Sequence, residues 1–279
     1  MLAFVDALGR EVEVRRQPRR IVSLVPSWTE ALFAFGLGEA VVGVTRFCVE
    51  PREGVAGKAK VGGTKTLDVE RVRELAPDLV LANAEENERG QIEELIGTGL
   101  TVFVTFPRTV AGAIETMGQL AAMTGSLGAW PLVEAAEVAL AEARAANVGR
   151  RPLRVFCPIW RNPRRQAQGR LWMTIGPDTY MHDFIAACGG ANVFGDSGER
   201  YPRLELAAAA SRDPEVVLLP DEPYRFRERH VPELRAFAEV SAVRQGRIYL
   251  LEGKHLCWYG PRIAGSLRYV RGLLWGQGG

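Results

Sequence analysis

Aromatic and arginine side chains recur where short apolar segments of this chain end. Rings can stack on a flat ligand, and guanidinium groups can pair with carboxylates at its edge. The loops at these positions therefore predict a site for a large, flat and partly apolar ligand with acidic groups. A glycine-containing loop at residues 62–66 would permit close approach of such a ligand. The predicted contacts are Trp28, Arg46, Thr64, Lys65, Glu85, Arg108, Trp160, Trp172, Tyr224, Trp258, Tyr259 and Arg262.

Histidine and cysteine show no spacing typical of a metal centre. His182, His230 and His255 form no H-x-x-x-H pair, and the four cysteines contain no C-x-x-C pair. Scattered histidines and reduced thiols are more often packing residues than ligands. We therefore expect no metal held directly by side chains.

Composition and charge are those of an ordinary globular protein. The chain has 279 residues, of which 47% are hydrophobic, and 35 basic against 33 acidic side chains give a net charge of +2. This balance gives no reason to expect a nucleic acid partner. The first residues show no secretory signal or lipid-anchor cysteine, and no apolar run could span a membrane. The expectation is a cytoplasmic protein, or a periplasmic one if a signal has been removed.

The order of predicted elements indicates an α/β fold with two lobes. Short apolar strands alternate with helices on both sides of an Ala- and Glu-rich segment at residues 129–147, which reads as one helix. Such alternation favours parallel sheets covered by helices, as in Rossmann-like folds. We expect an N-terminal lobe at 1–126, a rigid connecting helix at 127–149 and a C-terminal lobe at 150–279. The ligand would lie in a groove between the lobes.

Local signals make three further predictions. Ser27 and Glu30 have the spacing of a capping box, and Asp68 is placed to cap the helix that follows it. Residues 153–160 read as one strand. Residues 75–81 are echoed by residues 212–218, each after a short helix, so the two lobes are expected to share a topology.

Six segments of the chain resemble the substrate-binding proteins for cobalamin, haem and ferric siderophores, the family with a helical backbone between its lobes. They are residues 20–30, 42–45, 61–64, 76–81, 188–194 and 213–218, and the match runs in order from about residue 6 to 271. The resemblance implies two α/β lobes bridged by a rigid helix. It also implies binding without catalysis or a resident cofactor, because the metal arrives already chelated by a corrinoid or a ferric chelator.

The resemblance also implies an ABC transporter as partner and a monomeric receptor. Receptors of this type present one surface glutamate on each lobe to the permease. The first position corresponds to Glu70, whereas Ala207 stands at the second. Thr64 stands near the aromatic that stacks on cobalamin in the cobalamin receptors.

Two alternatives use a related two-lobe fold. One is a cytoplasmic sensor or storage protein, which would bind the ligand without docking on a transporter. The other is a chelatase-like tetrapyrrole enzyme, which needs a histidine paired with a carboxylate. His182 with Asp183, and His255 with Glu252, are its candidate pairs.

Overall fold

The computed structural model describes residues 2–14, 17–162 and 171–276. These residues form two compact units, each assembled from more than one stretch of chain. Unit 1 consists of Met1–Pro107, Gly112–Ala136 and Tyr259–Pro261. Unit 2 consists of Arg108–Ala111, Glu137–Trp258 and Arg262–Gly279. The α/β class and the parallel sheets expected from the sequence are confirmed in both units.

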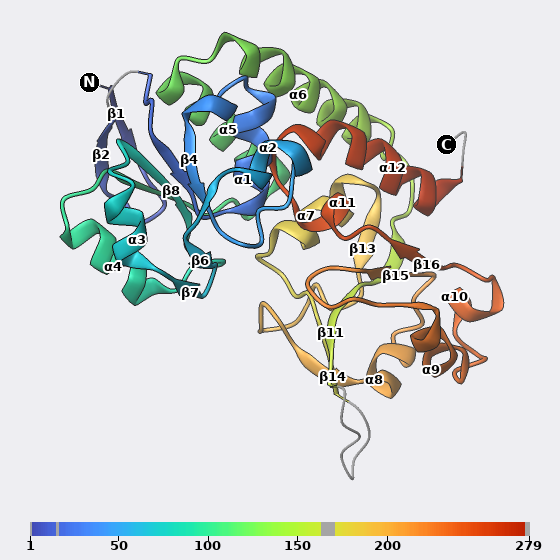
Figure 1. Ribbon diagram of the computed structural model, residues 1–279. Helices are drawn as coiled ribbons and strands as arrows, with labels where there is room; N and C mark the ends of the chain where they lie inside the picture. Colours follow the sequence, from blue (N-terminus) through green and yellow to red (C-terminus); the bar gives the residue numbers. More distant parts are fainter. Residues whose placement is uncertain (1, 15–16, 163–170, 277–279) are drawn as a thin grey trace. The chain divides into compact units, whose positions relative to one another are not determined.

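Unit 1 is built on a parallel sheet of five strands in the order β5-β4-β3-β8-β9 (Figure 1). Alternate strand residues such as Val80 and Ala82 form a cluster with Val72 of α3 and Leu95 of α4, so these helices cover one face of the sheet. Two antiparallel pairs, β1-β2 and β6-β7, accompany the sheet. The strands are β1 Leu2–Val5, β2 Glu11–Val14, β3 Ile21–Ser23, β4 Val41–Val44, β5 Ala59–Lys60, β6 Gly62–Gly63, β7 Thr66–Leu67, β8 Leu79–Asn83 and β9 Val102–Thr105.

The helices up to residue 145 test both capping predictions. Asp68 accepts a hydrogen bond from the Arg71 amide and caps α3, as predicted. The capping box at Ser27 is wrong, because α1 begins one residue earlier at Pro26 and Ser27 lies buried inside its first turn. The helices are α1 Pro26–Ala34, η1 Gly38–Ala40, α2 Arg52–Ala56, α3 Val69–Glu74, α4 Arg89–Gly97, α5 Val110–Thr124, η2 Leu127–Ala129 and α6 Trp130–Ala145.

Unit 2 contains a parallel sheet in the order β13-β10-β15-β16 and an antiparallel sheet in the order β11-β12-β14. The single strand expected at residues 153–160 is wrong, because it divides at Cys157 into strands that belong to different sheets. Leu219 of the first sheet and Trp172 of the second belong to one core cluster. The strands are β10 Leu153–Phe156, β11 Pro158–Arg161, β12 Leu171–Thr174, β13 Gly190–Asn192, β14 Arg203–Glu205, β15 Val216–Pro220 and β16 Ile248–Leu251.

Short helices connect the strands of unit 2, and a longer one, α12, ends the described chain. Its 13 residues present Leu267 and Val270 to the interior. The helices are α7 Tyr180–Ala187, α8 Leu206–Ala210, η3 Glu228–His230, α9 Val231–Arg235, α10 Ser241–Arg244, α11 Lys254–Cys257, η4 Gly260–Arg262 and α12 Ile263–Trp275. None of the helices described is long and apolar enough to cross a membrane.

The internal repeat is a structural one. In unit 1 the Asp78 carboxylate accepts from the Arg20 amide, and the Arg20 side chain donates to the Ala76 carbonyl. In unit 2 the corresponding positions make corresponding bonds: Glu215 accepts from the amide of Arg154, whose side chain donates to the Asp213 carbonyl. Ala76 and Asp213 both have φ of 43°. The same junction therefore begins β8 and β15.

The predicted connecting helix corresponds to α6. Its residues up to Ala136 belong to unit 1 and those from Glu137 to unit 2. The helix is shorter than the predicted range of 127–149, because η2 precedes it and residues 146–149 form turns. Its part as a rigid connector, like the three-part division of the chain, stays a prediction.

Candidate functional site

In open parallel sheets ligands bind beyond the carboxyl ends of the strands, where loops can vary without disturbing the core. In unit 1 the loop after β4 offers a cation and a ring there. Arg46 and Phe47 are both exposed, with the guanidinium carbon 5.1 Å from the Phe47 ring centroid. A Cβ on Gly63 would lie only 2.9 Å from the Arg46 guanidinium, so the glycine permits this position. Phe47, which was not predicted as a contact, is 49% exposed.

The neighbouring loops of unit 1 are tied together by polar contacts. Lys65 donates from Nζ to the carbonyls of Glu85 and Asn87, at 2.6 and 3.1 Å. The buried Asn87 amide donates to the carbonyls of Leu24 and Thr64. Lys65 and Asn87 therefore hold the β6–β7 hairpin against the strand ends. Thr64 and Glu85 lie half-buried beside this link, and their predicted ligand contact stays untested.

Trp28 belongs to the core of unit 1. It is fully buried, its indole nitrogen donates to Thr105 Oγ1 at 2.9 Å, and its ring lies 5.3 Å from that of Tyr259. Tyr259 is itself only 4% exposed. The two rings pack against each other and leave little surface for a ligand, and their predicted contact stays untested.

In unit 2 the two tryptophans predicted near residue 160 differ in environment. Trp160 on β11 is 37% exposed, whereas Trp172 on β12 is fully buried. Trp172 stacks on Phe226 with 15° between the rings, and the Arg161 guanidinium, paired with Glu233, lies over its ring. Trp172 is therefore a core residue, and its predicted ligand contact stays untested.

Trp258 is held between charged groups. Lys254 and Arg262 place their charges 5.3 and 5.6 Å from its ring, and its indole nitrogen donates to Glu222 Oε2 at 3.0 Å. With 7% of its surface exposed, Trp258 supports the loop and offers little contact area, and its predicted ligand contact stays untested. Burial raises the pKa of the Glu222 carboxyl, although the bond from Trp258 opposes the shift.

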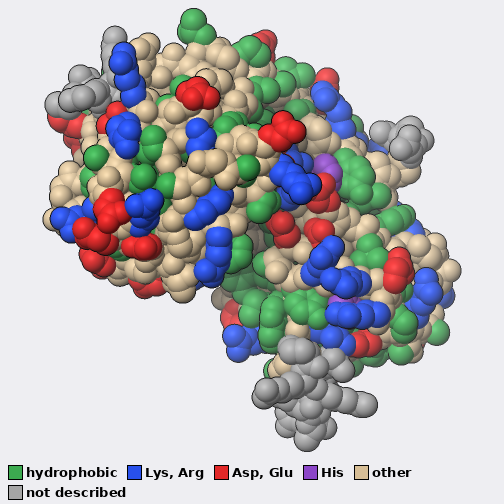
Figure 2. All heavy atoms as spheres, viewed as in Figure 1, with side chains coloured by type: hydrophobic (Ala, Val, Ile, Leu, Met, Phe, Trp, Pro, Cys, Tyr) green, Lys and Arg blue, Asp and Glu red, His purple; other side chains and the backbone are tan. Residues whose placement is uncertain are grey.

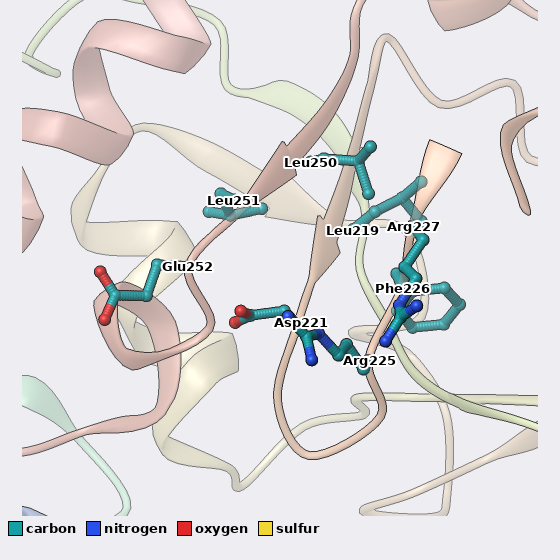
Figure 3. A pocket seen from close by; sticks show the side chains of 8 residues that line it. All are labelled: Leu219, Asp221, Arg225, Phe226, Arg227, Leu250, Leu251 and Glu252. Atoms are coloured by element: carbon teal, nitrogen blue, oxygen red, sulfur yellow. The ribbon is translucent and has the colours of Figure 1, made fainter. Parts of the chain in front are cut away.

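The loop after β15 borders a pocket of about 550 Å³ within unit 2 (Figure 3). It lies at the carboxyl ends of β15 and β16, where the strand-end rule places a ligand. Tyr224 lies beside the pocket, half-buried, with its ring 4.8 Å from that of Phe226. The sequence analysis placed Tyr224 here but missed Arg225 and Arg227, although both follow the same strand. The lining residues are Leu219, Asp221, Arg225, Phe226, Arg227, Leu250, Leu251 and Glu252.

Two of the predicted residues lie on the surface in ion pairs. Arg108 donates to both carboxylate oxygens of Asp178 at 2.9 Å. Glu70, the predicted docking residue, is exposed on α3 and pairs with Arg73 at 2.8 Å. Ala207, at the second docking position, is exposed on α8.

The histidine pairs that an enzyme would need are engaged in packing. His255 has Nδ1 3.0 Å from Ser266 Oγ, its ring lies 4.4 Å from that of Tyr269, and Nε2 is 4.0 Å from Glu252. Burial lowers the pKa of His255. Asp183 accepts from the Val110 amide at 2.7 Å. The described residues contain no group of three or more His, Cys, Asp or Glu that could hold a metal ion.

Comparison with known families decides the relationship. The family model described as "Periplasmic binding protein" matches residues 21–254. This chain belongs to that family. The periplasmic binding proteins are substrate-binding proteins and not enzymes, and membership confirms the resemblance noted in the sequence.

Two curated relatives of this periplasmic binding protein are informative. The vitamin B12-binding protein of Salmonella typhimurium is 30% identical over 204 residues, covering 72% of this chain and 71% of the relative. An ABC transporter substrate-binding lipoprotein of Bacillus subtilis is 25% identical over 265 residues, covering 92% and 80%.

Two solved structures share the fold. The periplasmic vitamin B12-binding protein of Vibrio cholerae superposes with a TM-score of 0.79 at 22% identity, covering 93% of this chain and 98% of that one. A periplasmic haem-binding protein in complex with two haems gives 0.75 at 25% identity, covering 91% and 97%.

These findings correct the predicted compartment. The expectation of a cytoplasmic protein is wrong, because the family and its structural neighbours are periplasmic and the Bacillus relative is a lipoprotein. The cytoplasmic sensor and the chelatase-like enzyme are not favoured.

Proposed function

We propose that this protein binds a metal chelate, a corrinoid or a ferric chelate such as haem or a siderophore complex, and delivers it to an ABC transporter. One observation carries the proposal: a pocket at the strand ends of unit 2 in a chain whose family members bind such ligands. The pocket combines Phe226 and leucine side chains with guanidinium groups. This combination suits a ligand with an apolar body and polar edges.

The contacts we propose are those that the structure leaves accessible. Arg46 and Phe47 supply a cation and a ring in unit 1, and Trp160 and Tyr224 supply rings in unit 2. An exposed aromatic loses little conformational freedom on binding, and a stacking contact contributes about 1 kcal/mol. Because the metal arrives already chelated by its organic ligand, the protein needs no catalytic group and acts by binding alone.

For docking we propose a single carboxylate anchor in unit 1. Glu70 is exposed on α3 and its partner Arg73 is also exposed, so a permease arginine could replace Arg73 at little cost. Ala207 gives unit 2 no equivalent charge. We propose a monomer that docks through Glu70. A Glu70→Lys variant should keep its affinity for the chelate and lose transporter-dependent uptake; equal uptake would remove Glu70 from the docking surface.

A titration tests the binding function. Cyanocobalamin, ferric protoporphyrin IX and a ferric hydroxamate siderophore are added separately while tryptophan fluorescence and the visible spectrum of the chelate are followed. We expect saturable binding of one of them, with the chelate recovered unchanged. Trp160→Ala should weaken that binding about fivefold or more, whereas the control Trp130→Ala, at another exposed tryptophan, should not. Silence with all three chelates would overturn the proposed function.

A further inference from the structure

The pocket at the ends of β15 and β16 has an apolar floor and a charged rim. Leu219, Leu250 and Phe226 come from the strands and the following loop, and Arg225 and Arg227 alternate with Phe226 along that loop. Figure 3 shows Asp221 and Arg225 across the turn of the loop, while Glu252 extends to the opposite side of the view. The rim therefore carries charged side chains of both signs.

The acidic side chains of the rim already have partners in the protein. Asp221 Oδ1 accepts from the Gly253 amide at 2.7 Å, which closes the loop onto the end of β16. Glu252 pairs with Lys254 at 3.2 Å. These carboxylates are therefore committed to holding the two loops, and their charges are partly balanced.

The two arginines differ from the acids in this respect. Arg225 and Arg227 are exposed, and among the residues described neither guanidinium forms a salt bridge with a carboxylate. An arginine beside an apolar pocket offers two parallel donors that match a carboxylate, and charge-assisted bonds of this kind are strong. Two such groups on one rim would fit a ligand that carries carboxylates at its edge.

The charge distribution along the sequence points the same way. The segments of unit 2 contain 22 Lys and Arg against 15 Asp and Glu, whereas those of unit 1 contain 13 against 18. Figure 2 shows Lys and Arg side chains on the visible faces of both units, with several close together in unit 2. An excess of positive charge raises the local concentration of anionic ligands and their association rate.

We propose that this pocket binds the carboxylate edge of an anionic chelate, with Arg225 and Arg227 as the specificity-determining residues. The inference rests on the proposed function and narrows it. The chelate carries two or more ionised carboxylates and an apolar or aromatic body, as a ferric porphyrin does. A corrinoid, whose edge is mostly uncharged amides, gains less from the two guanidinium groups.

Binding of four probes to the full chain tests this. The probes are ferric protoporphyrin IX, its dimethyl ester, ferric citrate and cyanocobalamin. The variant Arg225→Gln/Arg227→Gln is compared with Arg203→Gln/Arg235→Gln, which removes two exposed arginines of unit 2 outside the pocket lining. Both variants lose the same net charge, so a difference between them reports the pocket and not the overall field.

We expect at least one carboxylate-bearing probe to bind the parent. The pocket variant should bind it about 10- to 100-fold more weakly, and the control variant about as well as the parent. Raising the salt concentration should weaken binding to the parent more than to the pocket variant. The dimethyl ester should bind the parent about as weakly as the free acid binds the pocket variant.

Contrary outcomes separate the inference from the function on which it rests. Tight cyanocobalamin binding with no binding of either carboxylate probe would overturn the inference and keep the receptor function. If both variants bound a carboxylate-bearing probe as well as each other, the inference would also be overturned and the receptor function kept. Absence of binding by every probe would overturn both proposals, and circular dichroism of each variant establishes that it is folded.

Discussion

Arg108 and Asp178, 70 positions apart in the chain, meet in a two-pronged ion pair with both oxygens 2.9 Å from one guanidinium nitrogen. Both side chains are about half exposed, so water and salt screen the pair. The arginine predicted as a ligand contact thus has an acidic partner within its own unit.

The pair makes a first prediction. Arg108→Ala should lower the free energy of unfolding by about 1 kcal/mol or less, as exposed pairs do. If Arg108 also contacts an anionic chelate, Asp178→Asn should strengthen chelate binding by releasing the guanidinium, whereas Arg108→Gln should weaken it. Denaturation and titration of the three variants check this, and unchanged affinity in both binding variants would remove Arg108 from the site.

Trp160 and Trp172 give a second prediction, because they are 12 residues apart yet differ in burial. Trp172→Ala should destabilise the fold by about 3–5 kcal/mol, since it empties a large buried volume beside Phe226. Trp160→Ala should change stability by less than about 1 kcal/mol. Urea denaturation measures both, and equal losses would contradict the assignment of Trp172 to the core and Trp160 to the surface.

Glu215 makes a third prediction, on acid stability. Hydrogen bonding from Arg151 lowers the pKa of this carboxyl to about 2. A depressed carboxyl pKa stabilises the fold above the unfolded pKa, near 4.5, and this contribution is lost as pH falls through about 2. Because Arg151 is largely exposed, we expect Glu215→Gln to cost only about 1–2 kcal/mol at pH 7.

Denaturation at several pH values measures that cost. The difference in the free energy of unfolding between the parent and Glu215→Gln should disappear as the pH falls from about 4.5 to about 2. Glu205→Gln, at an exposed carboxylate of the same unit, should show no such change with pH. A difference that stayed constant down to pH 2 would contradict the role of the ionised Glu215.

Glu222 makes the opposite prediction. Burial raises the pKa of its carboxyl above the ordinary value, so its ionised form destabilises the folded state. The associated stability is present at low pH and is lost as pH rises through the folded-state pKa. Glu222→Gln keeps an acceptor for the Trp258 indole and should therefore be more stable than the parent at pH 8. At pH 4 the parent and Glu222→Gln should have nearly equal free energies of unfolding. A larger stability gain of the variant at pH 4 than at pH 8 would contradict the raised pKa of Glu222.

Local features were predictable from the sequence. Asp68 caps its helix because an N-cap needs only its own side chain and the amides that follow. The two halves of the repeat were recognisable because Pro77 and Pro214 each follow a helix end and precede an apolar strand. The residue before each proline has the same positive φ, so the chain takes the same turn at both positions.

The aromatic contacts could not be assigned so readily. A tryptophan near a strand end can contact a ligand or pack in the core. Which of these occurs depends on whether its side chain lies on the buried or the exposed face of the strand. Along β12, Leu171 and Met173 are half-buried and Trp172 is fully buried, so the alternation turns the ring inward. The burial of Trp28 could not be foreseen either, because the ring that packs against it comes from Tyr259, far along the chain.

The pocket arginines were missed for a related reason. Arg225 and Arg227 can bind a ligand only if the neighbouring carboxylates do not pair with them. Asp221, for example, accepts a hydrogen bond from the Gly253 amide. That contact joins the loops after β15 and β16, which are 32 residues apart. A hydrogen bond between loops this far apart in the sequence cannot be predicted from a local pattern of residue types.

The three residues Tyr259–Pro261 belong to unit 1 although both flanking stretches belong to unit 2. Gly260 adopts a φ of 87° there, and a Cβ at this position would come within 3.3 Å of the Ala31 methyl group. If the chain were cut in the middle of α6, the first half would lack Tyr259, which packs against Trp28. We expect the exposed Trp28 ring to promote aggregation of that half. We therefore expect that neither product of such a cut keeps its whole unit, because the first lacks Tyr259–Pro261 and the second lacks Arg108–Ala111.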